Sequence, residues 1–287
     1  MSEHLLSIGQ CATLACLLEV TAPKPGNVHR GADFDDLTYL DFAAAAVAMG
    51  PAFDATAAGA SLGQTVLTAV QAMRSAVDGN TSLGTILLLA PLAQVPRREP
   101  LAAGVERVLA GLSTEDSQHV YAAIRLAAPG GLGQVDQADV AGEAPGDLLH
   151  AMRLAADRDL VARQYVNGFE EVLQFVTPRL YEGLAAGWSL ADAIVRAQLQ
   201  LVHEFPDSLI ARKCGLDVAR QAAARAGKTL AAGVPGDEDY YRAIVDFDFW
   251  LRADGHRRNP GTSADLIAAG LFAALRDGMI ELPLRFY

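Results

Sequence analysis

Apolar residues recur at helical spacing along nearly the whole chain of 287 residues, and this periodicity limits the folds that it can adopt. The clearest stripe, between residues 61 and 78, consists of Leu62, Val66, Ala69, Val70, Met73 and Val77. Similar patterns predict helices over residues 3–20, 36–49, 81–92, 99–110, 114–127, 147–165, 169–186, 190–203, 209–226, 238–252 and 264–276. The sequence therefore predicts an all-α fold of about a dozen helices.

Residues typical of helix ends support these boundaries. Glycines stand where helices should stop, at Gly111, Gly187, Gly227, Gly233 and Gly255. Hydroxyl and carboxylate side chains stand where helices should start, at Ser113, Ser189, Asp207 and Ser263. The apolar run 85–92 fits a buried strand equally well by periodicity, but its position between helices favours a helix.

The chain is predicted to form one domain, residues 1–287. Hydrophobic residues make up 51% of it, which is enough for a large core. Strands and helices do not alternate, and no repeat of fixed period is present. The longest loop candidate is the Pro- and Gly-rich stretch 128–146, which either divides the chain into halves or serves as a functional loop within one domain.

Composition narrows the classes of function. The net charge of -11 argues against binding to nucleic acid or to an anionic membrane surface. No apolar run is long enough to span a bilayer, and no signal peptide is evident. Three cysteines without metal-binding spacing indicate reduced thiols and a cytoplasmic protein. A homodimer is compatible with the sequence.

The first of four polar segments, residues 21–30, is a stiff loop. Two prolines and a glycine fix its backbone, so that Lys24, His29 and Arg30 are presented with little entropy to lose on binding. Such a loop suits phosphate recognition. The acidic residues that follow, Asp33 and Asp36 among them, could hold a divalent metal. Alternatively, the segment is a rigid connector whose aspartates cap the next helix.

The second and third segments have weaker signals. Residues 79–84, with Asn80 and Thr81, open an apolar helix whose free N–H groups and dipole could bind an anion. In residues 155–165, Asp159 and Arg163 are spaced to form an exposed ion pair. Arg158 and its acidic neighbours cannot all share one helix face, so at least one of them turns inward or sideways.

The fourth segment has two parts, residues 206–213 and 257–266. Asp207 and Ser263 are typical helix caps, and Arg212 and Lys213 are equally consistent with solvated charges. Asp265, in a predicted first helical turn, is favoured by the helix dipole whatever its function. None of these residues indicates a function by itself.

Taken together and in order, these segments resemble the triphosphoribosyl-dephospho-coenzyme A synthases. The resemblance rests on Glu19 with Pro23-Lys24-Pro25-Gly26, on Asn80-Thr81 with Gly84, and on the run Pro260-Gly261-Thr262-Ser263-Ala264-Asp265-Leu266. It implies a helical enzyme that joins the ribose of ATP to a hydroxyl of 3′-dephospho-coenzyme A and releases adenine. The chain departs from the family at Asn27-Val28-His29-Arg30, where members usually have Leu-Val-Asp, and at Ser82-Leu83, where they usually have His-Lys.

The implied reaction defines what the site must contain. Displacement of adenine creates positive charge at the anomeric carbon, which calls for a nearby carboxylate, a proton donor for the base and a base for the hydroxyl. The catalytic candidates are His29, Asp33 and Asp207. The substrate-binding candidates are Lys24, Asn27, Arg30, Asn80, Thr81, Arg158, Arg212, Lys213 and Ser263. Asp36 and Asp265 are the candidate ligands of Mg²⁺, which would accompany ATP.

Three alternatives stay open at this point. The departures from the family leave room for another acceptor, such as a pterin-type precursor of a one-carbon cofactor. A hydrolase of N-glycosidic bonds would use the same carboxylates with water as the acceptor. A helical module that binds nucleotides without catalysis would also account for the changed motifs.

Overall fold

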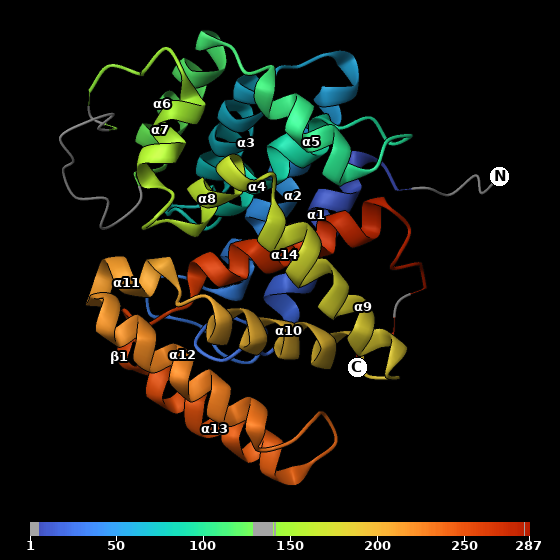
Figure 1. The fold of residues 1–287 in the computed structure, drawn as a ribbon, viewed down its shortest axis with the longest axis vertical. Helices are drawn as coiled ribbons and strands as arrows, with labels where there is room; N and C mark the ends of the chain where they lie inside the picture. Colours follow the sequence, from blue (N-terminus) through green and yellow to red (C-terminus); the bar gives the residue numbers. More distant parts are fainter. Residues whose placement is uncertain (1–5, 129–139, 141, 284) are drawn as a thin grey trace.

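The computed structural model describes residues 6–128, 140, 142–283 and 285–287. The described residues form fourteen α-helices (Figure 1): α1 (Ile8–Thr21), α2 (Tyr39–Asp54), α3 (Leu62–Ala76), α4 (Leu83–Gln94), α5 (Leu101–Ala110), α6 (Thr114–Ala127), α7 (Leu148–Ala155), α8 (Leu160–Asn167), α9 (Thr177–Ala185), α10 (Leu190–Glu204), α11 (Ser208–Cys214), α12 (Leu216–Ala231), α13 (Glu238–Arg252) and α14 (Gly261–Arg276). They are joined by a 3-10 helix η1 (Ala55–Ala58), a π-helix η2 (Glu171–Val176) and a short strand β1 (Ala253–His256). The all-α prediction is confirmed, and segment 81–92 is the helix α4.

Helix α14 crosses the middle of the molecule in Figure 1, with α3 to α8 on one side and α10 to α13 on the other. Nearly every one of its residues from Thr262 onward is buried, as expected of a helix that is apolar on all faces. Small residues let its neighbours approach closely. A Cβ added at Gly270 would lie 2.4 Å from Cγ1 of Val176. This helix therefore organises the core against α1, α4 and η2.

Two apolar clusters share helix α10. Ile194 and Leu201 belong to the larger cluster, which includes residues of α1 to α9 and α14. Val195 and Leu199, on another face of α10, pack in a smaller cluster with residues of α11, α12 and α13. Because α10 contributes to both clusters, the helices of the larger cluster and those of the smaller one are held together by continuous packing.

Two predicted helices are each broken into two. The prediction over 147–165 is wrong in the middle, where Asp159 starts α8 by accepting hydrogen bonds from the N–H groups of Val161 and Ala162 at 2.8 and 3.3 Å. The prediction over 209–226 is interrupted at Gly215, whose φ of 91° separates α11 from α12. Most other L-residues would be strained at that angle.

Several predicted helix ends are confirmed and others are wrong. Ser113, Ser189 and Asp207 cap the helices that follow them. Gly227 does not end a helix, because it lies within α12. A Cβ there would come within 2.7 Å of the His203 ring, so this glycine permits α10 and α12 to pack closely. Ser263 is not a cap either, since α14 begins at Gly261.

Other sequence predictions concern cysteines, membrane segments and the long loop. Cys11 and Cys16 are buried and Cys214 is partly exposed, and all three thiols are free. Among the described helices, none is both long and apolar enough to cross a membrane. Most of the predicted loop 128–146 lies outside the described residues.

The buried Arg276 at the end of α14 should contribute strongly to stability. Its guanidinium, 1% exposed, donates to the carbonyl groups of Val95, Pro96 and Glu99 at 2.6–3.1 Å. Replacing Arg276 with methionine leaves these acceptors without their donor. We expect the free energy of unfolding in urea to fall by about 3 kcal/mol. The control Arg107→Met, at a mostly exposed arginine, should change it by less than about 1 kcal/mol. Equal losses in both variants would contradict this role.

Candidate active site

A cavity of about 1260 Å³ lies where the polar segments of the sequence meet. Residues from the end of α1, the start of α4, helices α6 to α8, α11 and the first turns of α14 line it. We call this space the central cavity. Eight of the predicted site residues line it, namely Asn27, Asp36, Asn80, Thr81, Arg158, Arg212, Lys213 and Asp265.

The wall of the central cavity has an apolar part and a polar part. The apolar part comes mainly from α6 and α7, with Tyr121, Ile124, Leu148 and Met152. The polar part comes from the start of α4, the α7–α8 connection, α11 and the start of α14. An arrangement of this kind is suited to a ligand that combines a charged end with an apolar one.

Asp265 is held tightly beside the first turn of α4. Its Oδ1 accepts a hydrogen bond of 2.6 Å from the hydroxyl of Thr85, and its Oδ2 lies so close to Gly84 that a Cβ there would be 2.1 Å away. Burial raises the pKa of Asp265 to about 8, and the negative charges of Glu19 and Asp207 add to this effect. An adjacent cation would reverse this shift.

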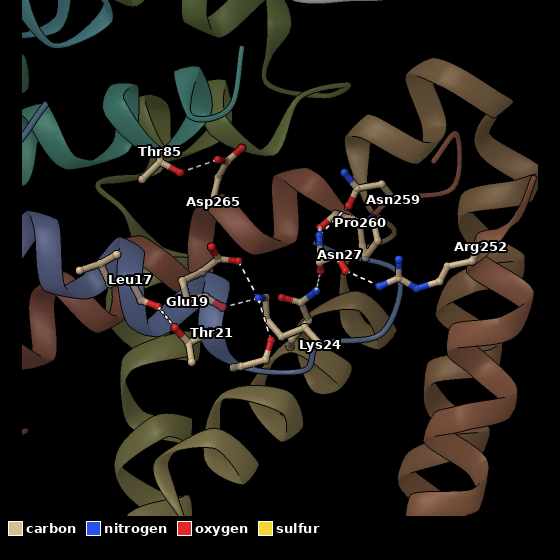
Figure 2. Close-up of polar contacts among 12 residues, drawn as sticks. Leu17, Glu19, Thr21, Lys24, Asn27, Thr85, Arg252, Asn259, Pro260 and Asp265 are labelled. Carbon is tan, nitrogen blue, oxygen red and sulfur yellow. Dashed lines mark hydrogen bonds and ion pairs between the residues drawn. The ribbon is translucent and has the colours of Figure 1, made fainter. Parts of the chain in front are cut away.

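Figure 2 shows Glu19, at the end of α1, below Asp265 and joined to Lys24 by an ion pair. Its Oε1 is 2.8 Å from Nζ of Lys24, and its side chain is only 12% exposed. Glu19 lines the central cavity, whereas Lys24 does not. The sequence drew attention to Glu19 through the family resemblance but assigned it no role.

Lys24 does not occupy the position expected of a phosphate ligand. Its side chain is completely buried, and its ammonium group donates to the carbonyl oxygens of Glu19 and Ala22 as well as to the Glu19 carboxylate. With these partners the ammonium cannot extend into the central cavity. The sequence predicts that Lys24 is presented to phosphate from a stiff surface loop, whereas the structure turns its side chain inward.

Asn27 connects the same loop to distant parts of the chain (Figure 2). Its amide nitrogen donates to Oδ1 of Asn259 at 2.6 Å, its side-chain oxygen accepts from Gln198, and its carbonyl accepts from Arg252. The loop is also held at Gly26, whose N–H donates to Asp248 at 2.7 Å. These bonds fix the loop that carries Lys24 against α10, α13 and the start of α14.

Three of the predicted cations line the polar part of the cavity. Arg158 follows α7, and Arg212 and Lys213 lie in α11. Arg212 is 3.5 Å from Asp159, which therefore does not form the predicted pair with Arg163. Arg163 also lines the cavity, but it pairs with Glu171 at 3.6 Å. Burial and the charge of Arg212 lower the pKa of Lys213.

The start of α4 borders the same space. Oδ1 of Asn80 accepts a hydrogen bond of 3.0 Å from the N–H of Leu83, the first residue of α4, whereas the N-cap residue Ser82 makes no side-chain capping bond. Thr81 and Ser82 line the cavity beside it. Backbone N–H groups and the positive end of the helix dipole attract anions in such a setting.

Asp207 and Ser263 have a structural place outside the central cavity. Both are completely buried, and Oδ2 of Asp207 accepts from the N–H and the hydroxyl of Ser263 at 2.7 and 2.8 Å. Its Oδ1 caps α11. Burial raises the pKa of Asp207, while these hydrogen bonds oppose the shift. The carboxylate joins the starts of α11 and α14, and neither residue lines the central cavity.

The remaining predicted site residues lie at the edge of the central cavity or outside it. Arg30 and Asp33 are exposed and do not line the central cavity, and Oδ1 of Asp33 accepts from the N–H of Tyr39 at 2.6 Å. His29 is partly buried beside them, also outside the cavity. Asp36 lines the cavity but is mostly exposed, and it lies 3.0 Å from Nδ1 of His256. This part of the predicted site is therefore separated from Asp265 and Thr85.

The surroundings of His29 should make the stability of the protein depend on pH. Burial, together with the positive charges of Arg252 and Lys24, lowers its pKa to about 4 from 6.5. Because the unfolded chain then binds a proton before the folded one does, the free energy of unfolding should fall as the pH drops through this window. The variant His29→Gln should lose less stability over the same range in urea titrations. Parallel curves for the two proteins would show that His29 is not buried in this way.

The residues present fit a Mg²⁺ ion that arrives with a phosphate ligand. Among the described residues, no group of three or more His, Cys, Asp or Glu side chains could hold a metal. Mg²⁺ often needs only one or two carboxylates when phosphates and water supply the other oxygens. Asp265 lies inside the cavity in negative surroundings, and it is the better placed of the two predicted ligands.

Comparisons with known proteins agree with this geometry. A crystal structure from Archaeoglobus fulgidus, described as a triphosphoribosyl-dephospho-coenzyme A synthase, is similar with a TM-score of 0.61 and 25% sequence identity. The match covers 82% of this chain and 98% of that one. A search of curated proteins finds no match. The family model for ATP:dephospho-CoA triphosphoribosyl transferases matches residues 6–282. The chain thus belongs to the ATP:dephospho-CoA triphosphoribosyl transferase family.

Proposed function

We propose that this protein transfers the triphosphoribosyl group of ATP to a hydroxyl of 3′-dephospho-coenzyme A and releases adenine. The observation that carries the proposal is the convergence of separate polar segments on one cavity. The start of α4, the α7–α8 connection, α11 and the start of α14 all contribute to its wall. Family membership supplies the reaction type, and the cavity supports it with groups of suitable chemistry.

The central cavity is large enough to hold two substrates together. Cavities that bind one small molecule usually measure about 300–1,000 Å³. This one, at about 1260 Å³, is larger. A reaction between ATP and a second nucleotide needs both substrates to be bound side by side, and correct alignment lowers the barrier by several kcal/mol.

The distribution of charge suggests how ATP is oriented. Arg158, Arg212 and Lys213 would bind the triphosphate, and Asn80 and Thr81 at the start of α4 would contact phosphate or ribose oxygens. Mg²⁺ bound to the phosphates would neutralise part of their charge. The apolar wall at Tyr121 and Met152 would then be left for the acceptor.

Incubation of the protein with ATP, Mg²⁺ and 3′-dephospho-coenzyme A tests the proposal. We expect free adenine and a ribosylated acceptor in equal amounts, measured by chromatography and mass spectrometry. Adenine release without any acceptor would identify a hydrolase. Release that requires a pterin precursor would identify another transferase. ATP binding without release would leave only the non-catalytic nucleotide-binding module.

A further inference from the structure

The ion pair between Glu19 and Lys24 lies in the wall of the central cavity and is unlike the other ion pairs near it. The lysine side chain is 0% exposed and the glutamate side chain 12% exposed, with 2.8 Å between the charged atoms. Arg212 and Asp159, which also line the cavity, are each more than a quarter exposed. A nearly dry pair of full charges therefore stands next to a space that we assign to substrates.

Such a pair is difficult to explain by stability alone. Removing two charges from water costs several kcal/mol for each ion, and apolar side chains of similar size are often equally stabilising. Lys24 is moreover held at three points, by the Glu19 carboxylate and by the carbonyl oxygens of Glu19 and Ala22. The ammonium thus holds the carboxylate at 2.8 Å and fixes its direction.

The loop that carries Lys24 is itself fixed. Asn27 accepts hydrogen bonds from Gln198 and Arg252 and donates one to Asn259. The N–H of Gly26 donates to Asp248. Of the two members of the ion pair, only Glu19 lines the cavity. A rigid loop, a buried cation and one carboxylate residue in the cavity wall form a built arrangement.

We propose that Glu19 is the catalytic carboxylate that stabilises positive charge on the ribose of ATP, and that Lys24 is its positioning residue. The proposal rests on the proposed function. In the step, the bond between C1′ and N9 of adenine breaks, and its electron pair leaves with the base. The acceptor oxygen forms a new bond to C1′. The proton that the hydroxyl loses balances the proton that adenine gains, and the carboxylate of Glu19 is unchanged at the end.

The four carboxylates among the predicted site residues are less suited to this role. Asp207 is completely buried, and both of its oxygens are engaged by helix starts and Ser263. Asp33 does not line the cavity, and Asp36 is mostly exposed at its edge beside His256. Asp265 is engaged by the hydroxyl of Thr85. Water weakens a charge at an exposed position, so a carboxylate in the dry wall stabilises a cationic transition state best.

Two variants separate a catalytic role from a structural one. Glu19→Gln keeps the shape but leaves the Lys24 ammonium buried without its counter-charge, so stability should fall. The double variant Glu19→Gln with Lys24→Met removes both charges and should regain stability in urea titrations. We expect kcat for adenine release to be reduced about 100- to 1000-fold in both variants. ATP affinity, measured by calorimetry, should change less than about threefold because the phosphate ligands are intact.

A matched pair elsewhere provides the control. Glu99→Gln with Arg107→Met removes an ion pair outside the cavity and should keep the wild-type kcat. A folded double variant at Glu19 and Lys24 with near wild-type kcat would overturn the proposal, because the pair would then be structural. If the wild type itself releases no adenine with any acceptor, the proposed function fails instead, so the two failures are distinguishable.

Discussion

Replacing Gly84 with alanine is expected to reduce kcat at least about 100-fold while the chain stays folded, because the carboxyl group of Asp265, the better placed candidate ligand of Mg²⁺, is displaced in the cavity wall. The added Cβ would lie 2.1 Å from Oδ2 and 2.6 Å from Cγ of Asp265. Asp265 has a short side chain and is held by Thr85 at 2.6 Å, so it must rotate or shift away from the start of α4. The change alters the cavity wall at the contact between α4 and α14, without adding or removing charge.

The stability of this variant distinguishes a displaced carboxylate from a damaged helix. Alanine is a better helix former than glycine by about 1 kcal/mol, so any loss of stability reports the clash. Adding Asp265→Ala to Gly84→Ala should restore stability but not activity. Gly111→Ala serves as a control, since its Cβ would meet no atom closer than 3.4 Å. Wild-type activity in Gly84→Ala would show that the position of Asp265 does not matter.

Replacing Arg212 and Lys213 together with alanine is expected to weaken ATP binding roughly 1000-fold. Each cation that contacts a phosphate through charge-assisted hydrogen bonds contributes about 1.5–3 kcal/mol. The two residues are neighbours on α11, and both line the central cavity. Burial and mutual repulsion already lower the pKa of Lys213, a situation that a polyanionic ligand relieves. The affinity of the wild type should also decrease at high salt.

The matched control removes two positive charges outside the cavity. Arg220→Ala with Arg242→Ala changes the net charge of -11 by the same amount, at two mostly exposed arginines of α12 and α13. Calorimetric titration with ATP and Mg²⁺ should give wild-type affinity for this control. If both double variants bind ATP equally well, the triphosphate does not lie against α11.

Helical periodicity was sufficient to predict the fold but not its interruptions. The apolar stripe of residues 61–78 appears as α3, and residues 114–127 form α6 with the predicted bounds. Asp159 was interpreted as a surface residue within a helix, although it caps a new one. Asp159 also pairs with Arg212, which lies in a helix about fifty positions further along the chain. Sequence spacing contains no information on such a contact.

The candidate site was predictable as a set of segments, but the direction of each side chain was not. Asn80, Arg158 and Asp265 line the central cavity. Lys24 and Asp207 turn inward, because a buried partner compensates each charge. Whether a charged residue faces water or a partner is decided by tertiary packing. Only the structure therefore shows that Glu19 lines the cavity, whereas Lys24, its ion-pair partner, does not.

The place of α14 at the centre of the molecule has a consequence for biosynthesis. Its buried face packs against α1 and α4, which emerge from the ribosome long before it does. Until residues 261–276 have been translated, α1 packs only against earlier elements such as α2, and α4 only against earlier ones such as α3 and α5, and the faces that α14 covers stay exposed. Nascent chains that stop before α14 should consequently require chaperones and be degraded rather than accumulate as partly active fragments.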